Sequence, residues 1–266
     1  MKGSVQKTTR IYAFDTLRGL LLLSMIAFHA CYDLVYIHGW LSPLNPLFVQ
    51  CWRLSISGGF LILAGAMSAY SRHNIYRSLR YGLCALLIFC VTTIFRIDTP
   101  INFGIIYCMA ASSFLAGLLQ ALWMRLQYMR SHARTYITII CVVCAFVCFC
   151  ITKDVSTGVL HLGVCDYTLP SVLFETNYVS WLGFPGRDFS SGDYYPLIPY
   201  SFLFFAGVFA GAGTKRAVCA HAQLLQALSI PLVTQLGKHA LIVYLLHQPL
   251  ILGCLSLCAS ASATVQ

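Results

Sequence analysis

An apolar run near the start of the chain, residues 15–40, carries ionisable side chains at helical spacing. Arg18 and His29 are eleven residues apart, close to a whole number of turns at about 3.6 residues per turn. His29 and Asp33 are four apart, which places them on one helix face, and Asp15 extends the same stripe. Charges inside a bilayer are costly and usually face a functional interior. We therefore predict a functional polar stripe, rather than one that only joins helices.

An imidazole with a carboxylate one turn later suits group transfer. Asp33 could fix the tautomer of His29 and stabilise its cation. A neutral His29 could take a proton from an acceptor, or carry the transferred group itself. Basic side chains near the cytoplasmic side could hold the phosphates of an activated donor. For this donor site we select Arg10, Arg18 and Arg72.

Other polar residues lie in or near the apolar segments. Arg53 is expected at the depth of Asp33 and is its predicted ion-pair partner, since each charge would be costly alone in lipid. His247 and Gln248 come directly before Pro249, which can free a backbone carbonyl and kink the helix. The residues that we assign to acceptor binding or to a structural polar network are Asp15, Arg53, Asp193, His247 and Gln248.

The composition indicates a membrane protein. Of 266 residues, 59% are hydrophobic and 9% are charged, whereas about 25% of a soluble domain is charged. The formal net charge of +9 comes from 17 Lys and Arg against 8 Asp and Glu. The basic residues lie between apolar segments, as orientation signals do. No basic run is interleaved with aromatic residues, so we expect no nucleic-acid partner.

Seven segments approach the roughly 20 apolar residues that a spanning helix needs. Basic connections alternate with non-basic ones, which by the positive-inside rule places the N-terminus inside and the C-terminus outside. We predict an all-α integral membrane protein, a single bundle of about seven transmembrane helices in the cell (inner) membrane. The expected spans are residues 15–36, 47–70, 79–95, 103–124, 136–151, 196–213 and 238–258.

These spans define the predicted organisation. Residues 1–14 form a cytoplasmic segment, residues 15–258 the transmembrane domain and residues 259–266 a tail. The extracytoplasmic connection 153–195 is long for a compact bundle, and long ordered loops are often lids or binding loops. Its aromatic residues, Trp181 among them, stand beside polar ones. That mixture suits a sugar face or an aromatic belt at the membrane interface.

Thirteen cysteines raise the question of disulfides and metals. Most lie within apolar runs, where a free cysteine behaves as a small hydrophobic residue. Cys31, Cys51 and Cys165 lie near one predicted face, which leaves a bridge open. No C-x-x-C pair is placed with histidine at zinc-finger spacing, and we expect no metal.

The chain resembles a known family along most of its length. In order, the segments are FDTLRGLLLLSMIAFHACYDL, FLILAGAMSAYSR, FGIIYCMAASS, DYYPLIPYSFLFFAGVFAG and LGKHALIVYLLHQPLILG. They are similar to bacterial relatives of the catalytic domain of heparan-alpha-glucosaminide N-acetyltransferase. The similarity runs from about Arg10 to Gly253, and HQP and DYYPLIP are its most specific parts. The resemblance implies acetyl transfer from cytosolic acetyl-CoA to an extracytoplasmic glycan, without a metal.

The resemblance nominates two catalytic histidines. The wider transmembrane acyltransferase group shares an Arg followed eleven residues later by a His, here Arg18 and His29. The active His of the lysosomal enzyme, aligned with a small gap, corresponds instead to His38 in YIHGW. We favour His29, because it lies in the helix beside Asp33, and keep His38 as the second candidate.

Two other function classes stay open at this point. A proton-coupled transporter or flippase would use the His and Asp side chains as a relay, although no inverted repeat is evident, and transporters often have one. A non-catalytic membrane partner protein would leave the polar stripe without a purpose. The expected partners of the favoured acetyltransferase are membrane lipid, acetyl-CoA and a glycan acceptor, and a homodimer is left open.

Overall fold

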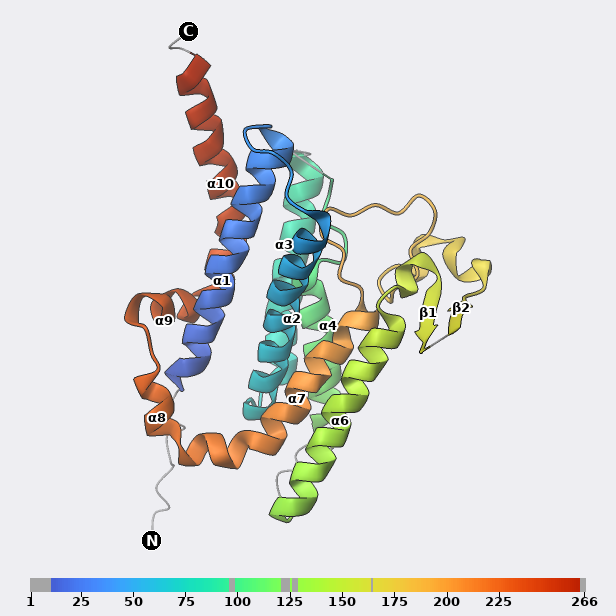
Figure 1. Ribbon diagram of the computed structural model, residues 1–266, viewed down its shortest axis with the longest axis vertical. Coiled ribbons are helices and arrows are strands. Elements are labelled where there is room, and N and C mark those ends of the chain that lie inside the picture. The colour runs from blue at the N-terminus through green and yellow to red at the C-terminus, as the bar shows by residue number, and fades with distance from the viewer. Residues whose placement is uncertain (1–10, 96–98, 121–124, 126–128, 164, 264–266) are drawn as a thin grey trace. The chain divides into compact units, whose positions relative to one another are not determined.

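The computed structural model describes residues 11–95, 99–120, 125, 129–163 and 165–263, and these are mainly helical (Figure 1). Within them, six helices are long and apolar enough to cross a membrane. Their bounds are α1 (Tyr12–Tyr32), continued by the π-helix η1 (Asp33–Ile37), α2 (Pro46–Tyr70), α3 (Asn74–Phe95), α6 (Ser131–Thr152), α7 (Leu197–Ala220) and α10 (Ala240–Ala263). The shorter α-helices are α4 (Ile105–Leu118), α8 (Ala222–Ala227) and α9 (Pro231–Lys238).

These helices confirm the predicted class of an all-α, multi-pass membrane protein, and six of the seven expected spans coincide with long helices. The fourth expected span, residues 103–124, contains α4, which has 14 residues and is short for a span of about 20. Residues 121–124 lie outside the described residues. The count of seven, the single bundle and the orientation of the termini stay predictions.

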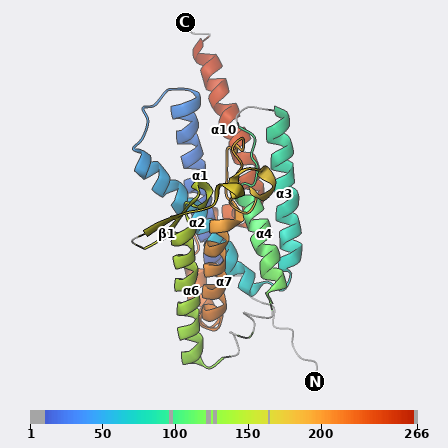
Figure 2. The ribbon, with the colours of Figure 1, turned by 90° about the vertical axis from the view of Figure 1, so that its right-hand side faces the viewer.

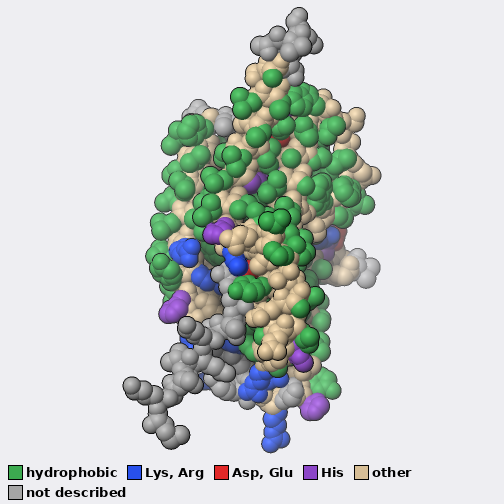
Figure 3. All heavy atoms as spheres, turned by 90° about the vertical axis from the view of Figure 1, so that its left-hand side faces the viewer, with side chains coloured by type: hydrophobic (Ala, Val, Ile, Leu, Met, Phe, Trp, Pro, Cys, Tyr) green, Lys and Arg blue, Asp and Glu red, His purple; other side chains and the backbone are tan. Residues whose placement is uncertain are grey.

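Large apolar side chains cover the outer surface of the helices. Leu79, Leu83 and Leu86 form one exposed face of α3, and Leu246 and Leu250 are exposed on α10. Figure 3 shows hydrophobic side chains over most of the face that it presents. Extended apolar patches are unusual on a monomer in water and typical of membrane contact, which agrees with the spans.

The described residues form two compact units. The first unit extends up to Ile56 and resumes at Ala217, so it holds α1, η1, the start of α2, the end of α7, and α8 to α10. The second unit runs from Ser57 to Arg216 and holds the remainder.

In the first unit, α1 packs against α9 and α10. The α1–α9 contact is so close that a Cβ atom on Gly237 would overlap the carbonyl oxygen of Asp15. Likewise, a Cβ on Gly19 would overlap the carbonyl oxygen of Val233. Small residues let helix backbones approach in this way within membranes. The two glycines therefore fix how α9 lies along the polar stripe of α1.

In the second unit, α2 and α7 meet through glycines, and α3 packs along α4 (Figures 1 and 2). A Cβ on Gly65 would overlap the carbonyl oxygen of Phe204, and a Cβ on Gly207 would overlap that of Ile62. Small residues permit such a close helix approach within membranes. This contact forms the tightly packed core of the second unit.

The connection 153–195 contains secondary structure that the sequence analysis did not predict. An antiparallel hairpin pairs β1 (Val159–Leu162) with β2 (Cys165–Thr168). Three 3₁₀ turns accompany it: η2 (Val155–Thr157), η3 (Ser171–Phe174) and η4 (Asn177–Val179). Helices α8 and α9, in the link before the last span, were also not predicted.

A histidine joins two carboxylates at this hairpin. His161 stands opposite Asp166 in the strand register, with its Nδ1 2.7 Å from Oδ1 of Asp166. Its Nε2 lies 2.6 Å from Oδ2 of Asp154. An ionised carboxylate only accepts hydrogen bonds, so this geometry fits an imidazolium that donates from both nitrogens. The hydrogen bond to Asp154, followed by that to Asp166, raises the pKa of His161.

Candidate active site

The polar stripe on the first helix divides into two clusters with different partners. Asp15 and Arg18 lie at the contact of α1 with α9, whereas His29 and Asp33 meet residues of α10. Asp15 and Asp33 are buried. The stripe predicted from helical spacing thus faces protein partners in the first unit, as a membrane helix with charges requires.

The first cluster holds an ion pair at the α1–α9 contact. Nη1 of Arg18 lies 3.0 Å from Oδ1 of Asp15 and donates to the carbonyl oxygen of Gly237 at 3.3 Å. The ammonium of Lys238 lies 4.7 Å from the centre of the Tyr12 ring. Two cations therefore lie near the start of α1, and the carboxylate of Asp15 orients one of them.

The second cluster is a contact between polar side chains of α1–η1 and α10. Nε2 of Gln248 donates to both carboxylate oxygens of Asp33, at 3.1 Å each. One turn earlier, the ring of His29 lies 4.9 Å from the ring of His247, centre to centre, at an interplanar angle of 62°. Four of the predicted site residues thus meet in one place.

His247 has a defined tautomer in this cluster. Its Nδ1 lies 2.6 Å from the carbonyl oxygen of Tyr244, and a carbonyl only accepts, so Nδ1 carries the proton. The residue is 9% exposed, and its Nε2 is buried without a hydrogen-bond partner among the described residues. A neutral His247 therefore presents a lone pair at Nε2 inside the protein.

The first helix changes its winding at Asp33. From there η1 follows π-helical geometry, and the backbone N–H of His38 donates to the carbonyl oxygen of Asp33 at 3.0 Å. Single π turns inside helices are frequent at functional sites. His38 ends this turn, and its ring lies 4.9 Å from that of Trp40. The two candidate histidines thus have different surroundings, since the ring of His29 lies beside His247 of α10 and that of His38 beside Trp40.

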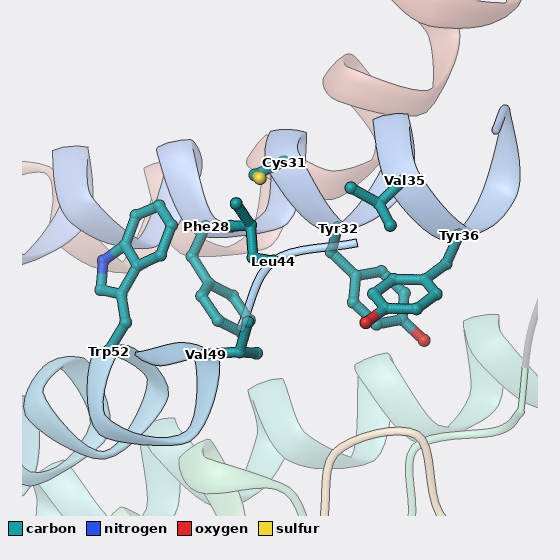
Figure 4. Close-up of a pocket in the computed structure, with 8 residues that line it drawn as sticks. All are labelled: Phe28, Cys31, Tyr32, Val35, Tyr36, Leu44, Val49 and Trp52. Atoms are coloured by element: carbon teal, nitrogen blue, oxygen red, sulfur yellow. The ribbon is translucent and has the colours of Figure 1, made fainter. Parts of the chain in front are cut away.

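An apolar pocket lies on the neighbouring face of α1–η1, between it and the start of α2 (Figure 4). The ring of Phe28 links the pocket to the second cluster, lying 5.7 Å from the His29 ring and 5.3 Å from the Trp52 ring. Such aromatic faces can pack against apolar groups or a sugar face. The pocket is lined by Phe28, Cys31, Tyr32, Val35, Tyr36, Leu44, Val49 and Trp52.

The remaining predicted site residues lie elsewhere. Arg10 is outside the described residues, and Arg72 is exposed between α2 and α3 in the second unit. Arg53 lies on α2, and its ion pair with Asp33 stays a prediction. Asp193, also in the second unit, accepts a hydrogen bond from the backbone N–H of Ile105 at 3.2 Å. That contact stabilises the start of α4, because helix N-termini favour negative charge.

Sequence reasoning missed several supporting groups. Thr16 and Thr234 join α1 to α9 through hydroxyls 2.7 Å apart, and the carbonyl of Tyr244 fixes the His247 ring. Thr16 could have been suspected as a polar residue directly after Asp15. Every residue has a backbone carbonyl, so the sequence does not indicate which one binds His247. The tautomer of His247 could therefore be assigned only from the structure.

Neither a metal group nor a disulfide is found in the part of the chain that the structure describes. Within those residues, no group of three or more His, Cys, Asp or Glu side chains could hold a metal ion. All thirteen cysteines are free thiols, including Cys31, Cys51 and Cys165.

Comparisons with known proteins complete the description of the site. Searches of curated proteins and of solved structures gave no match. A family model described as heparan-alpha-glucosaminide N-acetyltransferase, catalytic, matches residues 10–249. The match includes both clusters and ends just after Gln248. The chain therefore belongs to the family of the heparan-alpha-glucosaminide N-acetyltransferase catalytic domain, a family of transmembrane acetyltransferases.

Proposed function

We propose that this chain moves an acetyl group from cytosolic acetyl-CoA to a sugar or glycan acceptor on the other side of the cell membrane. The observation that carries the proposal is the contact of His29 with His247 beside the buried Asp33–Gln248 pair. Ionisable groups buried between membrane helices are functional candidates by default. Here they lie within the residues that match an acetyltransferase family.

The first cluster supports the donor side of the proposal. Acetyl-CoA carries phosphates, which arginine and lysine bind through charge-assisted hydrogen bonds. Arg18 is oriented by Asp15 and retains 23% exposure of its side chain. Lys238 lies at the end of α9, on the same side of the first unit. With the N-terminus inside, as the basic connections predict, both cations would face the cytosolic donor.

The second cluster supports the transfer step. The bond between the acetyl carbonyl carbon and the CoA sulfur breaks, and that carbon bonds to an oxygen or nitrogen of the acceptor. The acceptor proton passes to the departing CoA, which leaves as the thiol. His29 takes part either as a base or by carrying the acetyl group. Asp33 holds the local geometry through Gln248.

The test is transfer of labelled acetyl from acetyl-CoA by purified protein in lipid vesicles. We expect transfer by the wild type and a fall of about 10²–10⁴-fold in His29→Ala, the usual range for an acid–base group. His38→Ala is the matched variant, and retained transfer there would support His29 as the catalytic residue. A loss confined to His38→Ala would reverse this choice.

Transport is the alternative that the same cluster would support. A histidine pair next to a buried carboxylate can relay protons through a membrane protein. If no CoA is released by any sample, even with glycan extracts added, the acetyltransferase proposal fails. A flux that depends on a proton gradient would then identify the transporter.

A further inference from the structure

Two hydrogen-bond acceptors of α10, on side chains that meet His29 and Asp33, are buried without a donor among the described residues. Nε2 of His247 and Oε1 of Gln248 have no hydrogen-bond partner among the described residues. The amide orientation of Gln248 is fixed, because only its NH₂ group can donate to the carboxylate of Asp33. Its oxygen must therefore point away from Asp33 as an acceptor.

A buried acceptor without a donor is unfavourable, and such groups in a native protein need an explanation. Here two of them belong to consecutive residues of α10. Both belong to side chains that contact the predicted catalytic pair, through the His29 ring and the Asp33 carboxylate. A ligand that carries several O–H or N–H groups could supply the donors that both acceptors lack. Sugars and amino sugars carry such donors.

We infer that His247 Nε2 and Gln248 Oε1 form the acceptor subsite, and that His247 is the base that takes the acceptor proton. This rests on the proposed acetyl transfer and deepens it. In the step, Nε2 takes the proton from the acceptor O–H or N–H as the new bond to the acetyl carbon forms. The C–S bond breaks, and Nε2 then gives the proton to the CoA sulfur.

The geometry of His247 suits this role. Its Nδ1–H is engaged by the carbonyl of Tyr244 at 2.6 Å, which leaves Nε2 as the basic nitrogen in the neutral ring. The same bond orients the ring and can stabilise the cation that forms, as the orienting group does in acyl-transfer sites. The ring centre of His29 lies 4.9 Å from that of His247. With the base assigned to His247, the role of His29 is to contact the acetyl group.

The decisive variant is His247→Asn, assayed for acetyl transfer to glucosamine in lipid vesicles. The Asn amide can still donate to the Tyr244 carbonyl, but it offers no basic nitrogen at the Nε2 position. We expect transfer to fall by about 10²–10⁴-fold and to recover in part when imidazole is added. His239→Asn, the same change at the junction of α9 and α10, is the matched control and should transfer at the wild-type rate.

The outcomes separate the two proposals. If the wild type transfers acetyl and His247→Asn transfers within twofold of it, the role of His247 is overturned and the acetyltransferase stands. If His247→Asn loses acetyl transfer, has the melting temperature of the wild type and is not rescued by imidazole, the role of His247 as the base is also overturned. If the wild type transfers none, the proposed function falls and this inference falls with it.

A measurement on wild-type protein covers the case in which His247→Asn does not fold. With ¹⁵N-labelled histidine, the NMR signals of His247 should be those of the Nδ1–H tautomer. They should shift when glucosamine is added to saturation. The Nε2–H tautomer, or signals that do not move with glucosamine, would overturn the inference.

Discussion

Replacing Gln248 by Met tests the buried polar contact on which the site depends. The change keeps side-chain volume but removes the amide that donates to both oxygens of Asp33 at 3.1 Å. The carboxylate is 0% exposed, so water cannot substitute for the lost donor. A hydrogen bond to a charged group contributes about 1.5–3 kcal/mol, and we expect a loss of stability in this range.

A neutral hydrogen bond in the same unit provides a reference for the size of this stability loss. Nε1 of Trp52 donates to Oγ of Ser24 at 2.9 Å, joining α2 to α1. Neutral bonds between membrane helices average about 0.6 kcal/mol in double-mutant cycles. Ser24→Ala should therefore destabilise the protein less than Gln248→Met. The measurement is reversible unfolding in mixed micelles, with each variant compared with the wild type.

A double-mutant cycle with Asp33→Asn isolates the charge. An Asn at this position can pair with Gln248 once the amides reorient, so the neutral pair retains a hydrogen bond. In that background Gln248→Met should cost about 1 kcal/mol less than in the wild type, since a neutral bond replaces a charged one. Costs that add within about 0.5 kcal/mol would mean no coupling. That result, or a cost no larger than that of Ser24→Ala, would refute the reasoning.

Three further changes test other parts of the structure. Gly237→Ala should destabilise the protein by about 1–3 kcal/mol through overpacking, because the new Cβ would overlap the carbonyl oxygen of Asp15. Gly253→Ala is the control: nothing lies within 4 Å of the added Cβ, so its free energy of unfolding should be close to that of the wild type in the same assay. Arg18→Ala should raise the Kd for acetyl-CoA in a binding assay on folded protein, and unchanged affinity would remove Arg18 from the donor site. The raised pKa of His161 means that its stabilisation is complete below its unfolded pKa of about 6.5 and is lost as pH rises through the folded value. The hydrogen-exchange protection factors of the hairpin, corrected for the intrinsic pH dependence of exchange, should fall over that range, and His161→Gln should abolish that fall.

The spans could be predicted because a membrane demands long apolar segments, whatever their neighbours. The bounds of α2, Pro46–Tyr70, differ by one residue from the expected 47–70. The short elements carried no such signal. The hairpin β1–β2 has four residues in each strand. It is stabilised in part by the hydrogen bonds of His161 to two carboxylates. The contact of His161 with Asp166 depends on the register of the two strands, which a single sequence does not specify.

Within the site, the sequence predicted which residues share a face but not which helix that face meets. The i to i+4 spacing of His29 and Asp33 follows from helix geometry alone. Gln248 could not be assigned to Asp33, because its partner depends on how α10 packs against α1. The packing of α9 on α1 depends in turn on Gly19 and Gly237, whose effect is a close backbone contact and not a periodic pattern.

The helices depart from regular geometry at the residues that meet. On the first helix the π turn begins at Asp33. On α10 the residue after Gln248 is Pro249, which has no N–H to donate to the carbonyl one turn before it. The missing donor at Pro249 is unfavourable in lipid, where every backbone group needs a partner within the protein, whereas the π turn keeps the hydrogen bond from His38 to Asp33. Regular helices would suffice if the polar side chains only joined α1 to α10. A π turn and a proline at one contact are what we expect if His29, Asp33 and the pair before Pro249 are aimed at a common ligand.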